Sequence, residues 1–296
     1  MLSKTYLIVS LLFLTILLVC CVNISVVGKN TSWLCQFQNF SPLKISKTKF
    51  TIVVIDYSRD GSDDGALSLK DVETIRKSGK IVLAYMNVGY AEDWRFYWNK
   101  IKNATFVGNE GKWSGEYKIL NFTDDEWEKV LHEYVEKIIS EGFDGIYLDG
   151  VDAYENFKDK KIHEEEMVTL VKKIRSWIGQ DKKLSILNAY NLIDYDSSIS
   201  HLIDYLSVEG LFYKKTRKVK PSRYLPILKK IKEFMKDGVE ILSLDYVDDG
   251  SGYEGENLKR ILDYVKLARK NGFIPYAARK DLKLNVLNVI PGIQGE

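Results

Sequence analysis

The sequence predicts an α/β fold, a single (β/α)8 TIM barrel over residues 28–296 that follows an N-terminal hydrophobic segment. Three observations support this prediction. Eight apolar runs typical of buried strands recur after residue 50, helical patterns lie between them, and a length of 296 residues suits one α/β barrel. Regular strand–helix alternation requires parallel strands with right-handed crossovers, and eight such units close a barrel. An open doubly wound sheet is the alternative, although no Gly-x-Gly-x-x-Gly motif follows the first run.

The predicted strands are continuous apolar stretches, which is the pattern of strands buried on both faces. The first, Phe-Thr-Ile-Val-Val-Ile-Asp-Tyr, ends on a carboxylate. We expect an extra extended piece at residues 33–42, which caps the barrel or lines its mouth. The eight runs occupy residues 50–57, 81–89, 117–122, 145–150, 184–190, 205–210, 240–246 and 273–278.

Five amphipathic helices are predicted to cover the barrel. In residues 124–142, apolar side chains such as Trp127, Leu131 and Ile138 follow the spacing of one buried helical face. Each helix is followed by a glycine, which supplies the left-handed residue that ends many helices. The helical segments end at Gly79, Gly142, Gly179, Gly238 and Gly272.

The first 27 residues are predicted to be a signal peptide or a membrane anchor. Lys4 is the only charged side chain before Lys29, and residues 5–27 are an uncharged apolar block. A short positive start before such a block is the signal-peptide pattern, and the block is also long enough to span a bilayer of roughly 30 Å. We therefore expect a secreted or cell-surface protein, which contacts the membrane through this segment if the segment is not cleaved.

Composition narrows the function. With 45% hydrophobic and 28% charged residues, the chain is that of a folded protein. Its formal charge of +2 is too small for a phosphate-neutralising surface, so nucleic acid is not an expected partner. Aromatic residues make up 12% of the chain, and such rings offer apolar faces for stacking on sugars.

Polar side chains gather where the predicted strands end, and this end of a barrel carries the active site. Asp149 and Glu209 are the sharpest candidates, because a carboxylate directly after buried apolar residues is costly unless it is paired or used. Taken singly, either could instead cap a helix or brace a loop. Two carboxylates on opposite sides of one barrel mouth are what glycosidic bond cleavage requires.

Further residues are predicted to bind the substrate. Most of them end the other strands, while the connection after residue 89 carries aromatic rings that suggest a stacking platform for sugars, although half of them could serve only to pack that connection. The predicted substrate-binding residues are Asp56, Tyr85, Asn87, Trp94, Arg95, Asp152, Asn188, Tyr246 and Arg279.

Metal chemistry is the main competing use for these acids. The three histidines fall in helix or loop patterns and form no zinc-binding spacing. An oxygen-only Mg²⁺ or Ca²⁺ site from Asp56, Asp149, Asp152 and Asp245 remains an alternative. No Gly-x-Ser-x-Gly elbow is present, and no organic cofactor or metal is expected.

Four segments in this order resemble glycoside hydrolase family 114, typified by endo-α-1,4-polygalactosaminidases. They are FTIVVIDY, IVLAYMNVGYAEDWRFYW, GFDGIYLDGVDAY and LSVEG, and the likeness spans residues 33–280. The resemblance implies a secreted or surface barrel hydrolase of α-1,4-linked galactosamine polymers. It also implies a catalytic Asp at the end of strand four and a catalytic Glu at the end of strand six, which match Asp149 and Glu209.

The two strand-end carboxylates and this resemblance together predict a glycosidase. The resemblance implies that it acts on α-linked amino-sugar polysaccharide, and we expect retention of configuration. Asp149 is expected to attack the anomeric carbon, and Glu209 to protonate the leaving oxygen and then activate water. A carboxyl separation of about 5–5.5 Å would agree with retention, whereas about 6.5–9.5 Å indicates inversion. The alternatives are a non-catalytic glycan-binding barrel at the cell surface and a metal-dependent TIM-barrel enzyme.

Overall fold

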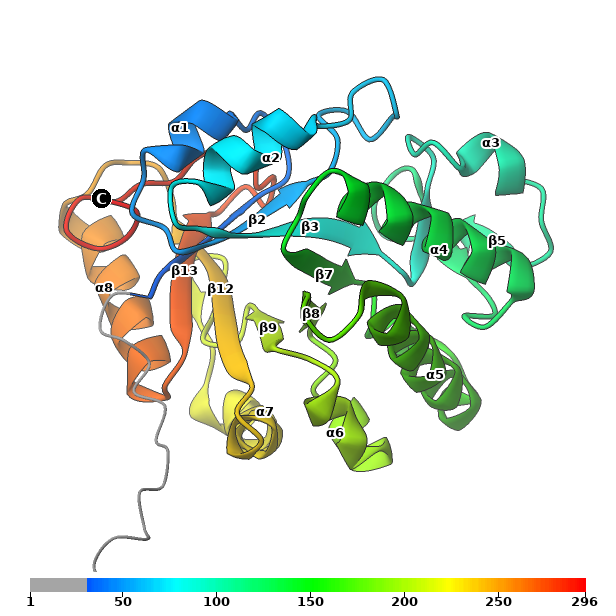
Figure 1. Cartoon of the computed structure of the whole chain (residues 1–296). Helices are drawn as coiled ribbons and strands as arrows, with labels where there is room; N and C mark the ends of the chain where they lie inside the picture. Colours follow the sequence, from blue (N-terminus) through cyan, green and yellow to red (C-terminus); the bar gives the residue numbers. More distant parts are fainter. Residues whose placement is uncertain (1–30) are drawn as a thin grey trace, which may run out of the picture. The chain divides into compact units, whose positions relative to one another are not determined.

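The computed structural model describes residues 31–296, which form one compact unit. Eight parallel strands follow one another in chain order and curl into a nearly closed barrel, with helices on its outside (Figure 1). This arrangement confirms the predicted TIM-barrel fold. The strands are β1 (Trp33–Gln36), β2 (Ile52–Asp56), β3 (Ile81–Asn87), β7 (Gly145–Asp149), β8 (Lys183–Leu187), β9 (Tyr205–Glu209), β12 (Glu240–Asp248) and β13 (Ile274–Arg279).

Five long helices form at the five predicted helical segments. The glycine that follows each of them has a φ between 77° and 89°, so the left-handed termination holds in every case. The helices are α2 (Leu69–Arg76), α4 (Asp125–Ser140), α5 (Lys160–Ile178), α7 (Pro221–Lys236) and α8 (Gly255–Lys270). Shorter helical pieces are α1 (Pro42–Ser46), α3 (Trp98–Ile101), α6 (Leu192–Tyr195) and the 3₁₀ turns η1 (Ala153–Asn156) and η2 (Ser197–His201).

Helix α4 shows how local sequence sets an element in place. The Asp124 carboxylate caps its first turn by accepting hydrogen bonds from the backbone N–H groups of Glu126 and Trp127, a contribution of about 1 kcal/mol. Trp127, Leu131 and further apolar residues of the predicted face are fully buried against the barrel. The helix therefore packs through the face that its apolar periodicity indicates.

Two strand predictions are wrong, and they compensate. The expected extra piece at residues 33–42 contains the first barrel strand, β1. The expected third strand, residues 117–122, belongs instead to a separate antiparallel sheet, in which β6 (Glu116–Ile119) lies between β4 (Tyr90–Glu92) and β5 (Val107–Glu110). Because one strand is gained and one is lost, β7 is still the fourth barrel strand and β9 the sixth. A two-stranded hairpin of β10 (Tyr213–Lys214) and β11 (Arg217–Lys218) follows β9.

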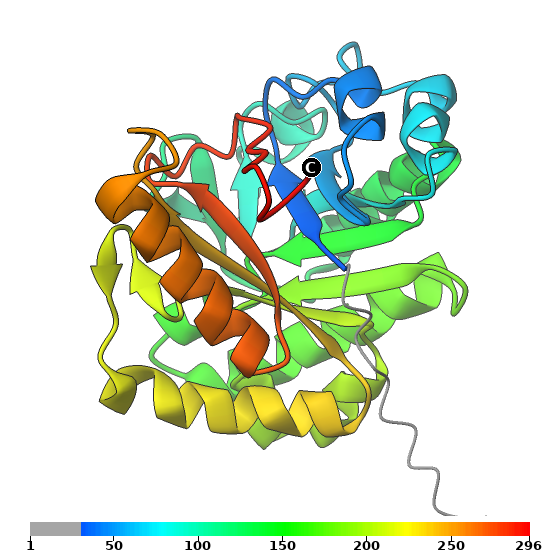
Figure 2. The same ribbon diagram turned by 90° about the vertical axis from the view of Figure 1, so that its left-hand side faces the viewer.

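The barrel is joined at its seam by a side chain. Within residues 31–296, β1 and β13 stand at the two ends of the strand order and share no backbone ladder. The indole N–H of Trp33 donates to the carbonyl oxygens of Ser243 (3.2 Å) and Ile274 (3.0 Å). The same ring packs against Tyr276 and Tyr147 inside the barrel. In Figure 2, β1 lies beside β13, with α8 covering the outer side of β13.

The predicted signal peptide or membrane anchor, residues 1–27, lies outside the described residues. From Thr31 onward, no helix combines the length and the apolar character needed to cross a membrane.

Candidate active site

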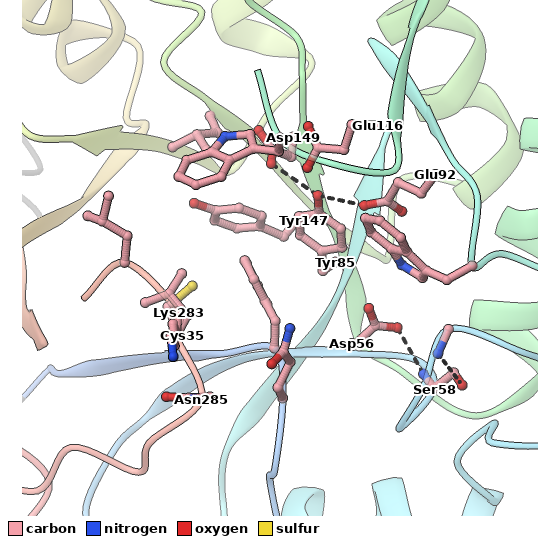
Figure 3. A pocket seen from close by; sticks show the side chains of 18 of the residues that line it. Cys35, Asp56, Ser58, Tyr85, Glu92, Glu116, Tyr147, Asp149, Lys283 and Asn285 are labelled. Carbon is pink, nitrogen blue, oxygen red and sulfur yellow. Dashed lines mark hydrogen bonds between the residues drawn. The ribbon is translucent and has the colours of Figure 1, made fainter. Parts of the chain in front are cut away.

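A cavity of about 840 Å³ opens at the carboxyl ends of the barrel strands (Figure 3). Strand residues such as Cys35, Tyr147 and Leu244 line it from the barrel. Three other segments line it: residues 58–61 after β2, the β4–β6 sheet and residues 281–285. The cavity is therefore built from the barrel mouth and three segments beyond the strands.

Asp149 is half-buried at the end of β7, where it lines the cavity. Its carboxylate accepts hydrogen bonds from the backbone N–H of Gly150 (2.6 Å) and the hydroxyl of Tyr85 (3.1 Å). Burial raises the pKa of Asp149 to about 6; the hydrogen bond from Gly150 works against this rise, and the negative charge of Glu209 adds to it. The field of Glu209 thus reaches Asp149, although the two lie 60 positions apart in the chain.

Glu209 ends β9 and opens onto the same cavity. The Asn188 side-chain oxygen accepts the backbone N–H of Glu209 at 3.0 Å, and Asn188 adopts a φ of 57° to do so. Surrounding protein atoms raise the pKa of Glu209 by displacing bulk water, while a hydrogen bond from Tyr246 and the charge of Lys112 work against that rise. Both candidate carboxyl groups thus have a raised pKa in one cavity, as catalytic acids and bases often do.

A buried ionic cluster supports this side of the cavity. Arg95 donates two parallel hydrogen bonds to Asp56, at 2.9 and 2.8 Å, and one to Glu92 at 2.5 Å. All three side chains are at least nine-tenths buried. Glu92 in turn lies 3.1 Å from the Tyr85 hydroxyl, so the cluster continues through Tyr85 to Asp149 (Figure 3).

Two further acids near Asp149 hold protons more strongly than usual. Glu116 lies directly opposite Glu92 in the β4–β6 pair and lines the cavity. Burial, followed by the charges of Glu92 and Asp149, raises the pKa of Glu116 to about 7. Burial and the charge of Asp149 also raise the pKa of Asp152 to about 7. Several carboxyl groups therefore lie close together near Asp149, and their mutual repulsion disfavours ionisation of all of them at once.

The aromatic residues after β3 divide into two pairs. Trp94 and Trp113 line the cavity and are 40% and 49% exposed. Trp98 instead stacks on Tyr117 at 4.5 Å, and Tyr97 is fully buried. Only half of these rings can therefore meet a ligand in the cavity.

Seven of the predicted site residues line the cavity, and four do not. The residues that line it are Asp56, Tyr85, Trp94, Arg95, Asp149, Glu209 and Tyr246. Asn87, Asp152, Asn188 and Arg279 lie outside its lining.

Three of these four side chains make hydrogen bonds or ion pairs outside the cavity lining. The Asn87 side-chain oxygen accepts the backbone N–H groups of Gly89 and Tyr90, and Asn87 is buried. Arg279 pairs with Asp248 at 3.1 Å, while Asn188 holds the backbone of Glu209. These positions are strand ends, as predicted, but their side chains serve the scaffold around the cavity.

Several lining residues were not named among the predicted site residues. Cys35 on β1 and Phe37 just after it belong to the piece expected to cap the barrel or line its mouth; it lines the cavity and also supplies a barrel strand. Residues 281–285 follow the last strand without periodicity, and Leu282 and Leu284 adopt positive φ values of 65° and 46° there. The apolar Trp-Leu-Cys run at 33–35 was the signal for β1, whereas the C-terminal loop had none.

The acids considered for an oxygen-only metal site do not gather. Across residues 31–296, no three His, Cys, Asp or Glu side chains stand together as metal ligands would. The buried Asp245 carboxylate accepts backbone N–H groups of Leu211, Phe212 and Tyr213, and Asp56 pairs with Arg95. Asp245 therefore shapes the loop after β9.

Comparison with known proteins gives a family match over most of the chain. Residues 22–294 match the model of glycoside-hydrolase family GH114. An uncharacterized protein of Thermotoga maritima is 37% identical, and the match covers 89% of this chain and 85% of that protein. An uncharacterized protein of Methanocaldococcus jannaschii is 35% identical, with 90% of this chain and 82% of that protein covered.

Solved structures resemble the chain in fold. The glycoside hydrolase domain of PelA from Pseudomonas aeruginosa superposes with a TM-score of 0.69 at 15% identity, covering 87% of this chain and 97% of that one. Aspergillus fumigatus Ega3 in complex with galactosamine gives 0.65 at 16% identity, covering 86% and 92%. At these identities the likeness establishes the barrel fold.

Proposed function

Because the chain belongs to glycoside hydrolase family GH114, we propose that it is a glycosidase in which Asp149 and Glu209 form the catalytic pair. One observation carries the assignment of the pair. Two carboxyl groups from the fourth and sixth barrel strands open onto one cavity, and each has a pKa above its usual value. Cleavage of a glycosidic bond needs two such carboxyl groups, one of which gives a proton.

The proposed reaction proceeds with retention. The Asp149 carboxylate attacks the anomeric carbon, the bond from this carbon to the leaving oxygen breaks, and Glu209 gives its proton to that oxygen. Water then attacks the anomeric carbon, gives a proton to Glu209 and releases Asp149 as a carboxylate. With a pKa of about 6, Asp149 is ionised near pH 7, and displacement of water raises the pKa of Glu209, the direction that suits a proton donor.

The proposed substrate is an α-linked amino-sugar polysaccharide. Trp94 and Trp113 offer exposed rings at the cavity for stacking on sugars. The galactosamine captured in Ega3, a protein of similar fold, supports the amino-sugar part of this proposal. We further propose that the protein is secreted or held at the cell surface, because residues 1–27 have the pattern of a signal peptide or anchor. Fractionation of expressing cells into medium, membrane and cytosol tests this localisation.

Digestion of an α-1,4-galactosamine polymer and a wider glycan panel, analysed by reducing-end assay and mass spectrometry, tests the activity. Asp149→Asn and Glu209→Gln should each lower kcat by at least about 10³-fold. Asp64→Asn, at an exposed aspartate outside the cavity lining, is the matched control and should keep wild-type turnover. NMR of the first-formed anomer distinguishes retention from inversion.

The results also separate the alternatives. Glycan binding without turnover on any substrate would favour a non-catalytic glycan-binding barrel. Activity that a chelator abolishes and a divalent cation restores would favour a metal-dependent enzyme. Full activity of either carboxyl variant would refute the assignment of the pair.

A further inference from the structure

The Tyr85 hydroxyl stands between two carboxyl groups but has only one proton to give. It lies 3.1 Å from Glu92 Oε1 and 3.1 Å from Asp149 Oδ2 (Figure 3). A phenolic hydroxyl donates one hydrogen bond, so it cannot serve both carboxylates at once. The carboxylate that does not receive this hydrogen bond faces the Tyr85 oxygen with no hydrogen atom between the two oxygens.

The surroundings of Tyr85 leave the hydroxyl no other role. The side-chain N–H of Asn87 donates to its oxygen at 3.3 Å, which uses one of its acceptor positions. Tyr85 is buried, and burial raises the pKa of its hydroxyl well above the usual value, so the proton stays on Tyr85. The choice is therefore between two directions of one O–H bond.

The two carboxyl groups differ in their other partners. The second oxygen of Glu92 accepts a hydrogen bond from the Arg95 guanidinium, which neutralises much of its charge. Within residues 31–296, Asp149 accepts hydrogen bonds from the backbone N–H of Gly150 and from Tyr85, and no cation pairs with it there. An ionised Asp149 therefore needs the Tyr85 proton more than Glu92 does.

We propose that Tyr85 is a positioning residue whose hydroxyl donates to Asp149 while that carboxyl is ionised and turns to Glu92 when Asp149 becomes neutral. This inference rests on the proposed function, in which Asp149 is neutral as the glycosyl ester. No proton leaves Tyr85 in this change; the O–H bond rotates about the C–O bond. The hydroxyl thereby stabilises the Asp149 carboxylate when it attacks and again when it leaves. While Asp149 is the neutral glycosyl ester, the hydroxyl donates to Glu92.

Other titratable groups also interact with Asp149, and the comparison must leave them unchanged. They are the carboxyl groups of Glu116, Asp152 and Glu209, the thiol of Cys35 and the hydroxyls of Tyr90 and Tyr147, while Glu92 and Arg95 act on Tyr85 itself. Replacement of one hydroxyl by hydrogen leaves all of them in place. A difference between wild type and Tyr85→Phe therefore measures the hydrogen bond.

The direct test is ¹³C NMR titration of the Asp149 carboxyl in full-length protein with labelled aspartate, assigned through Asp149→Asn. Tyr85→Phe should raise the apparent pKa of Asp149 by about 0.5–1 unit, because a hydrogen bond to the charged form is lost. Tyr147→Phe is the matched control, since Tyr147 is the cross-strand neighbour of Tyr85 and its hydroxyl bonds with Ser207. Its shift should be less than half as large. No rise in Tyr85→Phe, or an equal rise in Tyr147→Phe, would overturn the proposal.

The turning of the hydroxyl is tested with Asp149→Asn as the neutral state. With labelled glutamate, the apparent pKa of Glu92 should be lower in Asp149→Asn than in Asp149→Asn/Tyr85→Phe, because only the single variant keeps the Tyr85 hydroxyl that donates a hydrogen bond to Glu92. Equal values in the two proteins would refute the switch.

Kinetics give the third readout. Tyr85→Phe should lower kcat about 10–100-fold and leave KM within about threefold of wild type. It should also move the acid limb of the kcat/KM profile to higher pH, by the same amount as the pKa of Asp149 rises in the NMR titration. An unchanged limb would count against the positioning role. Because the NMR titrations need no turnover, a protein that shows both shifts but cleaves no glycan would retain the hydroxyl switch and lose the proposed function.

Discussion

Replacing Arg95 with methionine should destabilise the protein by about 3–5 kcal/mol at pH 7, which is the usual cost of removing one partner from a buried charge pair. Arg95 donates three hydrogen bonds to Asp56 and Glu92, and its side chain is 1% exposed. Methionine fills much of the same volume, so the loss is mainly electrostatic. The variant leaves two buried carboxylates without their cation.

The size of the effect follows from the burial of these partners. Side-chain exposure is 10% for Asp56 and 2% for Glu92, so little water can replace the guanidinium. Three aromatic rings also lie within 5.6–5.7 Å of the guanidinium carbon, and they lose a cation–π contact. The destabilisation should shrink as the pH falls and the orphaned Glu92 takes up a proton.

Urea unfolding followed by circular dichroism, together with thermal melts, measures this change. At about 2–4 °C per kcal/mol for a domain of this size, Tm should fall by roughly 6–20 °C. Arg59→Met is the control, because the Arg59 and Asp71 side chains are 49% and 30% exposed and their pair should contribute about 0–1 kcal/mol. Adding Asp56→Asn and Glu92→Gln to Arg95→Met should restore part of the loss. A cost below about 1 kcal/mol, or no such recovery, would refute the electrostatic reasoning.

Three further predictions follow from the site and its surroundings. Since Asp149 must be ionised to attack, kcat/KM should fall about tenfold per pH unit as the pH drops below about 6, which a pH–rate profile measures. Trp94→Ala should raise KM about 5–10-fold through lost stacking, whereas Trp98→Ala, which removes the ring stacked on Tyr117, should lower stability with KM unchanged. Burial raises the pKa of Glu141 from 4.5 to about 8, so stability is lost as the pH rises through that window. With allowance for screening at this half-buried site, denaturation should find Glu141→Gln about 1–2 kcal/mol more stable than wild type at pH 8.5 and equal to it at pH 4.

Regular helices and long buried strands were predictable from sequence because each leaves a periodic or continuous apolar pattern. The two strand errors have a physical cause. Residues 117–122 look like a buried run, yet exposed Lys118 within it is the mark of a half-solvated antiparallel strand. Strand β1 has four residues and is followed by the five-residue α1, so it lacks the long helix that signals a strand–helix unit.

The candidate site was predictable in position more than in detail. Strand-end carboxyl groups identified the cavity, because the barrel brings those ends together whatever the register. Side-chain direction is not contained in that pattern, and Asn87 turns to the backbone while Tyr85, two residues earlier, lines the cavity. Glu116 was not predicted because its place at the cavity depends on the pairing of β4 with β6, and no local sequence pattern indicated that pairing. The catalytic roles of Asp149 and Glu209 stay predictions.

The seam between the first and last strands is the place where we expect the barrel wall to open most readily. Where other neighbouring strands are joined by repeated backbone bonds, β1 and β13 are joined through the indole of Trp33 and, just beyond the strands, by the backbone N–H of Phe37, which donates to the Leu284 carbonyl oxygen. Cys35, a buried free thiol two residues further along the same strand, lines the cavity. Faster modification of Cys35 by a thiol reagent in Trp33→Phe than in wild type should therefore report loosening of the barrel wall beside the cavity.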